Sequence, residues 1–281
     1  MSILVAGSLH LDVVLRAPHL PHLDETVVGS AVDYVFGGKG GNQAVAAARM
    51  GADVAFAGRI GRDAFGAMIR EALVAAGVDI VQVQEDTGAS GMSAAIVEEG
   101  GEYGAVIVSA ANLRIDPDRI EVPDGTRLVL LQNEVPETVN LAVARLARKA
   151  GATIWLNAAP ARALSQDLVG MVDLLIVNRV EAAFYTGHLP GMCVLTTLGA
   201  EGVVFEDVAS PAHDINVVSA HGAGDMFVGA LAAQAASGVS VADAIPFAQA
   251  AAALHVSSPL DARATLSADA VRAFQARHAS R

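Results

Sequence analysis

The sequence predicts an α/β fold in which a mostly parallel sheet is covered by helices on both faces. Short runs of leucine and β-branched residues alternate with alanine-rich helical stretches. The chain is also 53% hydrophobic but only 4% aromatic, which suits aliphatic strands buried on both faces. Alternation of this kind is typical of strand–helix–strand units. Ligands of such sheets collect at the carboxyl ends of the strands, so we expect a site there.

Six runs are predicted to be the strands of this sheet, because each is short, aliphatic and bounded by turn residues. They cover residues 3–7, 53–61, 127–132, 153–158, 173–178 and 192–199. The intervening segments are predicted to be helices, because apolar residues recur three and four apart and several segments end in glycine. These helices cover residues 41–51, 63–77, 137–151 and 181–187.

Two stretches interrupt this alternation. Residues 11–36 contain prolines and alternating apolar residues, and residues 90–109 have the pattern of a hairpin with its turn at residues 98–101. We expect both to form one small β-sheet inserted into a single domain that spans residues 1–281. Such a sheet beside the ligand face would act as a lid or as a dimer surface. A hairpin without a role in the site is the alternative.

Charge and composition exclude some partners. The chain has 18 basic and 30 acidic residues, a formal net charge of −12, and an acidic chain repels phosphate backbones, so we expect no nucleic-acid partner. Cys193 is the one cysteine and fits a reducing compartment. The N-terminus lacks the pattern of a signal peptide, and no apolar run is long enough to span a bilayer. We therefore expect a soluble cytoplasmic protein without a membrane partner.

The stretch GAGD, Gly222–Asp225, comes directly before an alanine-rich helical run. The first N–H groups of a helix lack intrahelical partners and attract anions, and glycine lets a phosphate approach the backbone. Asp225 could cap the helix, bind a metal or act as a general base. A base beside an anion cradle is what phosphoryl transfer to an alcohol requires. Taken alone, the motif is also typical of a glycine turn with an aspartate cap.

Two further motifs present polar side chains. Four glycines surround Lys39 in FGGKGGNQ (36–43), which matches neither a P-loop nor a dinucleotide fingerprint. Its lysine and the amide of Asn42 suit hydrogen bonding to a polyol. Asn178 and Glu181 follow a predicted strand three residues apart. They could hold a hydrated Mg²⁺ or form a helix capping box.

Taken together, these motifs resemble those of the ribokinase-like (PfkB) carbohydrate kinases, most closely ribokinase. GGKGGNQA and GAGD resemble the two signatures of that family, and NRVE, NAAP and TLGAEG resemble three shorter motifs. The blocks keep their order and spacing from residue 3 to about residue 256. The resemblance implies a three-layer α/β/α core with a β lid, often shared across a homodimer. It also implies transfer of the ATP γ-phosphoryl group to a hydroxyl of a pentose or related sugar.

The resemblance also implies roles for individual residues. Asp225 would be the catalytic base, and Glu181 would organise Mg²⁺ through water. The anion hole would be formed by the amides of Gly222, Ala223 and Gly224. The sugar would contact His10, Asp12, Gly38, Lys39, Asn42, Glu134 and Asp225. ATP would be bound by Asn178, Thr197, Gly199, Gly202, Gly224 and Gln249.

Some positions depart from the family pattern. The chain reads SAHGAGD where the family often has DTTGAGD, so Ser219 replaces an aspartate tied to a monovalent-cation site and potassium activation is not implied. His10 replaces a sugar-binding asparagine, so ribose itself is not implied. The same side chain could instead be a buried structural histidine. The chain is short between Tyr185 and Met192, and the usual block after His255 is not recognisable.

Three other functions compete with a sugar kinase. A nucleoside kinase of the same fold would need aromatic or apolar walls for a base, and the chain is poor in aromatic residues. A catalytically weak protein that binds a sugar or a nucleotide would fit the altered cation motif, but the intact GAGD opposes it. A dinucleotide-dependent dehydrogenase would need a G-x-G-x-x-G after the first strand, which is absent.

Overall fold

A nine-stranded sheet forms the centre of the molecule in the computed structural model, which describes residues 2–98, 100, 102–187 and 191–278. Its strand order is β13-β12-β11-β10-β9-β8-β1-β4-β5, and all neighbours from β11 to β5 are parallel. The strands are β1 (Ile3–Ala6), β4 (Val54–Gly61), β5 (Asp79–Asp86), β8 (Leu128–Gln132), β9 (Thr153–Asn157), β10 (Leu174–Asn178), β11 (Val194–Thr197), β12 (Val203–Phe205) and β13 (Val208–Ser210).

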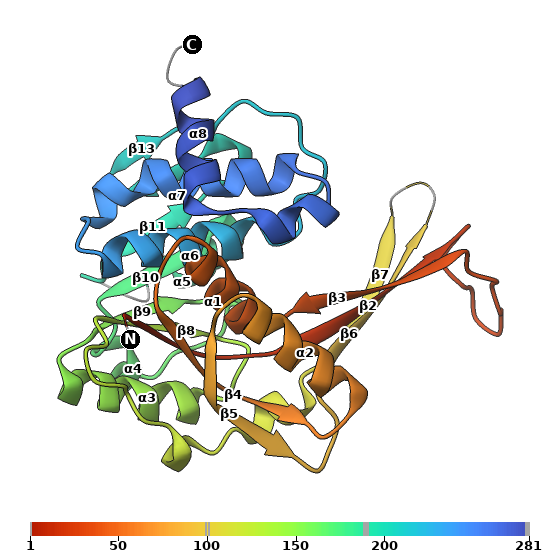
Figure 1. The fold of residues 1–281 in the computed structure, drawn as a ribbon, viewed down its shortest axis with the longest axis horizontal. Coiled ribbons are helices and arrows are strands. Elements are labelled where there is room, and N and C mark those ends of the chain that lie inside the picture. Colours follow the sequence, from red (N-terminus) through yellow and green to blue (C-terminus); the bar gives the residue numbers. More distant parts are fainter. Residues whose placement is uncertain (1, 99, 101, 188–190, 279–281) are drawn as a thin grey trace.

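Helices cover both faces of this sheet, so the predicted three-layer architecture is confirmed (Figure 1). One buried cluster joins the sheet to α1 (Lys39–Arg49), α2 (Ala64–Ala75), α6 (Ala223–Ala236), α7 (Val241–Ser257) and α8 (Ala268–His278). A second buried cluster joins the other face to α3 (Glu137–Ala150), α4 (Gln166–Val169) and α5 (Arg179–Tyr185). Short 3₁₀ turns lie at Ala110–Arg114, Pro117–Arg119, Gly199–Glu201 and Asp261–Thr265.

The predicted strands and helices all occur, with ends shifted by one or two residues. Three strands were not predicted. β5 reads DIVQVQED and has polar residues among its apolar ones, because it is an edge strand that faces solvent along part of its length. β12 and β13 have three residues each, too few for a pattern to be visible.

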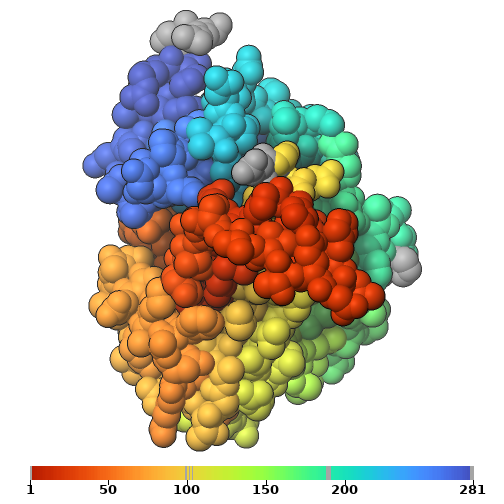
Figure 2. All heavy atoms as spheres, turned by 90° about the vertical axis from the view of Figure 1, so that its right-hand side faces the viewer, coloured from red at the N-terminus to blue at the C-terminus, as the bar shows by residue number. Residues whose placement is uncertain are grey.

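The small sheet consists of β2 (His10–Ala17), β3 (Ala31–Gly37), β6 (Gly91–Glu98) and β7 (Tyr103–Val108), in the order β3-β2-β6-β7. The prediction that two separated segments form one sheet is confirmed, because β2 pairs with β6 from His10↔Gly91 to Ala17↔Glu98. The sheet projects from one side of the core (Figure 1), and its first segment crosses the middle of that side in Figure 2. Two residues of the predicted turn, 99 and 101, lie outside the described residues.

The carboxyl ends of four neighbouring strands carry polar residues. β8, β9, β10 and β11 end at Gln132, Asn157, Asn178 and Thr197. The N-termini of α1 and α6 meet this edge, because Gln43 of α1 donates both to Asp225 of α6 and to Asn157 of β9. None of the described helices combines the length and apolar character that crossing a membrane would need.

Candidate active site

Asp225 lies in the first turn of α6, directly after a glycine in the left-handed conformation. Gly222 is the residue before the helix and has φ 75°, a backbone conformation that residues other than glycine rarely adopt. As a glycine, this N-cap residue has no side chain with which to cap the helix. Intrahelical bonding begins when the Met226 N–H donates to the Gly222 carbonyl at 2.9 Å. We call residues 222–225 the anion turn.

The N–H groups of the anion turn are not equivalent. That of Ala223 already donates to the Ala220 carbonyl at 3.2 Å. Those of Gly224 and Asp225 precede the first intrahelical bond, and such groups need a partner from outside the helix. Gly222, Ala223, Gly224 and Asp225 together line a cavity of ≈ 160 Å³. The turn therefore offers donors and the positive end of a helix dipole to an anion in that cavity.

A chain of amides holds the Asp225 carboxylate. Asn42 Nδ2 donates to one carboxylate oxygen at 3.1 Å, and Gln43 Nε2 donates to the other at 2.9 Å. Gln43 Nε2 also donates to Asn157 Oδ1 at 2.9 Å. Gln43 is in turn fixed by Gln132 Nε2, which donates to its side-chain oxygen at 2.9 Å. Four elements, α1, α6, β8 and β9, thus fix the orientation of one carboxylate.

Burial raises the pKa of the Asp225 carboxyl above its ordinary value. The positive charge of Lys39 and the bonds from Gln43 and Asn42 act in the opposite direction, and the negative charge of Glu134 adds to the rise. A carboxylate whose pKa is moved toward neutral pH is better matched to proton abstraction than an exposed one. The group is a base only when deprotonated, so its function is lost as pH falls through this raised pKa.

A carboxylate also lies at the N-terminus of α1. Glu134 Oε2 accepts the Lys39 N–H at 2.8 Å and the Ser8 Oγ–H at 2.5 Å. The residue before the helix, Gly38, has no side chain with which to cap it. Glu134, which follows β8 in the chain, therefore caps α1, and the helix dipole favours its negatively charged carboxylate. Lys39 lines the same small cavity as Asp225.

His10 and Asp12 lie where β2 leaves the core and enters the small sheet. His10 is 4% exposed, and its Nε2 has no hydrogen-bond partner in the part of the chain that is described. Asp12 Oδ1 accepts a bond from Ser93 Oγ of β6 at 2.5 Å. Neither side chain bonds to the Asp225 network within the described residues. A buried nitrogen without a partner is costly to desolvate.

Glu181 lines the small cavity and also caps a helix. Asn178 Oδ1 accepts the N–H groups of Val180 and Glu181 at 2.9 Å, and Glu181 Oε2 accepts the Asn178 N–H at 2.8 Å. The capping box, one of the two roles that the sequence allowed for Asn178 and Glu181, is thus formed. Glu181 is 7% exposed, and burial raises its pKa. One carboxylate oxygen makes the cap, so the cap does not use the whole group.

The second cavity beside the anion turn is larger and more apolar. It measures ≈ 430 Å³ and shares Thr197, Ala220, Ala223 and Gly224 with the small cavity. Its walls include Val203, His213, Ile215, Val217, Phe227, Ala252, Ala253 and Val256. Gly199, Gly202 and Gln249 also line it, whereas Asn178 lines only the small cavity. Gln249 Nε2 is engaged with the carbonyls of Ser210 and Pro211 at 2.8 and 3.1 Å.

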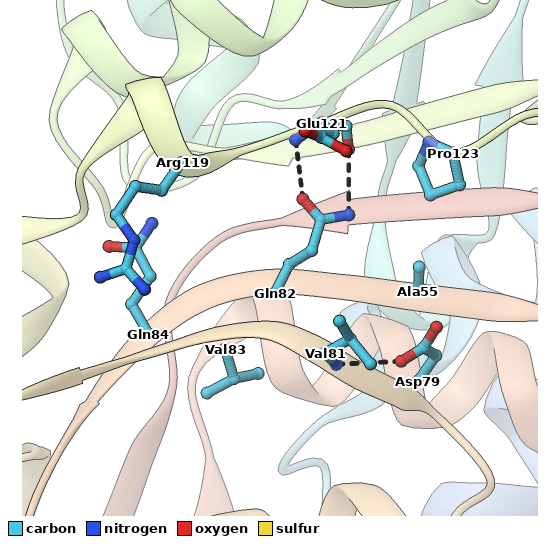
Figure 3. A pocket seen from close by; sticks show the side chains of 9 residues that line it. All are labelled: Ala55, Asp79, Val81, Gln82, Val83, Gln84, Arg119, Glu121 and Pro123. Carbon is cyan, nitrogen blue, oxygen red and sulfur yellow. Dashed lines mark hydrogen bonds between the residues drawn. The ribbon is translucent and has the colours of Figure 1, made fainter.

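A third hollow lies at the far edge of the sheet, beside β5 (Figure 3). Its volume is ≈ 390 Å³, close to that of the larger cavity, but it shares no lining residue with either cavity beside Asp225. The Gln82 amide there bonds to the backbone of Glu121 as both donor and acceptor, at 3.0 and 2.7 Å. The Gln84 amide likewise bonds to the backbone of Asp116, so both amides of this hollow are used for folding, whereas the anion-turn cavities hold the Asp225 carboxylate and the open N–H groups.

Known proteins share this architecture. Residues 1–267 match the family described as pfkB family carbohydrate kinase. The chain belongs to the PfkB family of carbohydrate kinases. It is therefore a phosphotransferase that acts on a sugar hydroxyl.

The relatives of this kinase include ribokinases from distant organisms. The ribokinase of Bacillus subtilis is 34% identical over 274 residues, which cover 92% of this chain and 93% of that protein. The structure of Arabidopsis thaliana ribokinase complexed with ribose and ATP superposes with a TM-score of 0.88 at 27% identity, over 97% of this chain and 98% of that one. Ribokinase of Thermotoga maritima gives a TM-score of 0.87 at 26% identity, over 98% and 99%.

Several residues of the site were not predicted. Gln132 and Asn157 support Gln43, Ser8 bonds to Glu134, and Ser93 bonds to Asp12. Gln132 ends a predicted strand and Asn157 lies one residue before the end of another, both on the expected ligand edge, and this position was a usable signal. Ser93 had none, because the pairing of β2 with β6 joins segments far apart in the sequence.

Proposed function

We propose that this kinase transfers the γ-phosphoryl group of ATP to a hydroxyl of a pentose or related sugar, with Asp225 as the catalytic base. The observation that carries the proposal is the buried Asp225 carboxylate, held by Asn42 and Gln43 beside the anion turn. The ATP complex of the Arabidopsis relative and the ribokinase names of the other relatives support both substrates.

The reaction follows from these positions. Asp225 takes the proton of the sugar hydroxyl, whose oxygen then forms a bond to the γ-phosphorus while the bond to the β-phosphate oxygen breaks. The N–H groups of Gly224 and Asp225 would stabilise the charge on the transferred group. Lys39, on the cavity wall, adds a positive charge to the same region. ADP leaves, and the proton on Asp225 returns to solvent.

The residues of the small cavity fit a hydrated Mg²⁺. Glu181 supplies one carboxylate on the cavity wall, and Mg²⁺ commonly keeps several waters and uses one or two carboxylates plus substrate phosphates. Within the described ranges no three His, Cys, Asp or Glu side chains group closely enough to hold a metal by themselves. When bound, the ion would neutralise phosphate charge.

The sugar would bind between the α1 N-terminus and the small sheet, and ATP in the larger cavity. His10, Asp12, Gly38, Lys39, Asn42 and Glu134 would contact the sugar. Asn178, Thr197, Gly199, Gly202, Gly224 and Gln249 would line the ATP path. We favour a bare sugar over a nucleoside, because the curated relatives are ribokinases.

The small sheet would act as the lid and as the surface of a homodimer. It exposes Leu15, Val32, Tyr34, Val106, Ile107 and Val108, which are large apolar side chains on the strands of one sheet. Exposed apolar side chains on one small sheet are typical of an interaction surface. Sedimentation equilibrium of the wild type and of a Val106→Lys, Ile107→Lys variant would test it; identical monomer masses would exclude the dimer.

A cytoplasmic location rests on the single cysteine and is tested by cell fractionation.

The central experiment measures ADP release from Mg·ATP with pentoses, hexoses, polyols and nucleosides, with the Asp225→Asn variant in parallel. We expect turnover with one sugar class, and about 10³-fold slower turnover in the variant, within the range for loss of a general base. Sugar binding to the variant should persist in a thermal-shift assay. Near-normal turnover of the variant would remove the base assignment. Turnover with nucleosides alone would favour the nucleoside kinase.

A further inference from the structure

Arg263 is a buried cation bound by backbone carbonyl oxygens. It lies in the 3₁₀ turn Asp261–Thr265 and is 6% exposed. Its Nη2 donates to the Ser219 carbonyl at 2.7 Å, Nη1 to the His221 carbonyl at 3.1 Å, and Nε to the Ser258 carbonyl at 3.3 Å. Within the described residues no carboxylate forms an ion pair with it. Burial lowers the pKa of this guanidinium, and no neighbouring acid offsets that shift.

This arrangement is unusual for an arginine. Buried charges in proteins are usually paired with an opposite charge, because an unpaired one is costly to desolvate. Three carbonyl oxygens that converge on one positive group instead have the chemistry of a site for a monovalent cation, in which carbonyls replace the hydration shell. In this chain the cation is a side chain and is therefore always present.

The carbonyls that Arg263 binds belong to the segment leading into the anion turn. Ser219 and His221 come just before Gly222. The His221 carbonyl receives a second contact from His255 Nε2 at 3.0 Å, a hydrogen bond in the tautomer that carries its proton there. A Cβ on Gly222 would lie 3.1 Å from the same Nε2. The side chains of Arg263 and His255 thus fix the backbone of residues 219–221, which leads into the anion turn.

Helix α1 is tied to the same point. Arg49, in its last turn, donates from Nη1 to the Arg263 carbonyl at 3.1 Å. The first turn of α1 holds Asn42, which bonds to Asp225. The carbonyl-bound cation therefore connects three parts of the molecule, namely the C-terminal end of α7, the C-terminal end of α1, and the segment 219–221.

We infer that Arg263 is a positioning residue that acts as a built-in monovalent cation and orients the anion turn for phosphoryl transfer. The inference rests on the proposed role of that turn. It explains why an aspartate is not needed at Ser219, since backbone oxygens and the His255 ring nitrogen, 3.2 Å from Nη1, surround the guanidinium, with no carboxylate paired to it among the described residues. If Arg263 takes the place of a monovalent cation, the activity of the wild-type protein should not respond to added potassium.

The test compares Arg263→Ala with the wild type and with Arg127→Ala. Arg127 also donates a guanidinium hydrogen bond to a carbonyl of α6, that of Ala236 at 3.1 Å, but at the opposite end of the helix. In Arg263→Ala we expect kcat to fall about tenfold to a hundredfold, less than the loss of a direct donor, with the sugar KM unchanged. Guanidinium or potassium ions at tens of millimolar should restore part of the kcat. Neither ion should change the wild type or Arg127→Ala.

A second variant covers the case in which Arg263→Ala does not fold. Arg263→Gln keeps hydrogen-bond donors but loses the charge, and should show the same fall in kcat with a normal sugar KM. Unchanged kcat in either variant, or no rescue by either ion in a folded Arg263→Ala protein, would overturn the inference. Absence of sugar phosphorylation in the wild type would instead overturn the proposed function, so the two failures are distinguishable.

Discussion

The two halves of the site are built in different ways. In the half proposed to bind the sugar, the charged or amide side chains of Asn42, Gln43, Glu134 and Asp225 are held by hydrogen bonds from several elements. On the nucleotide side, the walls are mostly aliphatic, and glycine turns bring the backbone to the cavity. The sugar side therefore depends on charge and hydrogen-bond geometry, whereas the nucleotide side depends on shape and backbone conformation. Substitutions in the two halves should fail for different reasons.

The nucleotide half should be most sensitive at Gly202. Its φ is 102°, and a Cβ there would lie 2.0 Å from the Ser210 carbonyl oxygen. Gly202→Ala should lower the free energy of unfolding by about 2 kcal/mol and raise the ATP KM, since backbone strain and a clash add. Thermal unfolding and ATP-dependent kinetics measure both effects.

Gly51→Ala is the matched control for this change. Gly51 has φ 92° and no atom within 4 Å of an added Cβ, so it shares the strain but not the clash. It should cost less stability and leave the ATP KM unchanged. An equal loss in both variants would show that strain alone acts and that loop shape does not.

The sugar half should respond to charge at Lys39. Lys39→Ala should raise the sugar KM about tenfold, the effect of losing one hydrogen bond to a charged group. The pKa of Asp225 should rise further, because the charge that opposes its burial is gone. The acid limb of the pH profile of kcat/KM should therefore move to higher pH. Lys149→Ala, which removes an exposed lysine in the last turn of α3, should change neither. An unmoved acid limb would separate Lys39 from Asp225.

The smallest effect is expected at His10, whose substitution should change the preference of the enzyme for one sugar over another. Its buried Nε2 lacks a partner among the described residues, so we expect it to bond to the sugar. His10→Asn should shift the ratio of kcat/KM values toward ribose by about tenfold. Its control, His22→Asn, changes an exposed histidine in the loop between β2 and β3. An unchanged sugar profile would return His10 to a structural role.

Much of the core could be predicted because local patterns and burial agree there. Strands such as β8, LVLLQ, are buried at every position and therefore read as continuous apolar runs. In β5, apolar and polar residues alternate because the strand lies at the edge of the sheet, so its sequence resembles that of a loop. The bounds of α1 and α5 differ from the predictions at their starts, because glycine-rich and capped first turns carry little periodicity.

The sequence alone determined several of the chemical groups at the proposed site. Asp225, Lys39, Asn42 and Glu181 lie in short motifs, since the backbone conformation each needs is local. Only the tertiary structure decided how these groups act on one another. Gln43 bonds to Asp225 across 182 positions of sequence, and Arg263 reaches Ser219 across 44. Such contacts, and the burial that raises the pKa of Asp225, arise when distant elements pack together, and no local pattern records them.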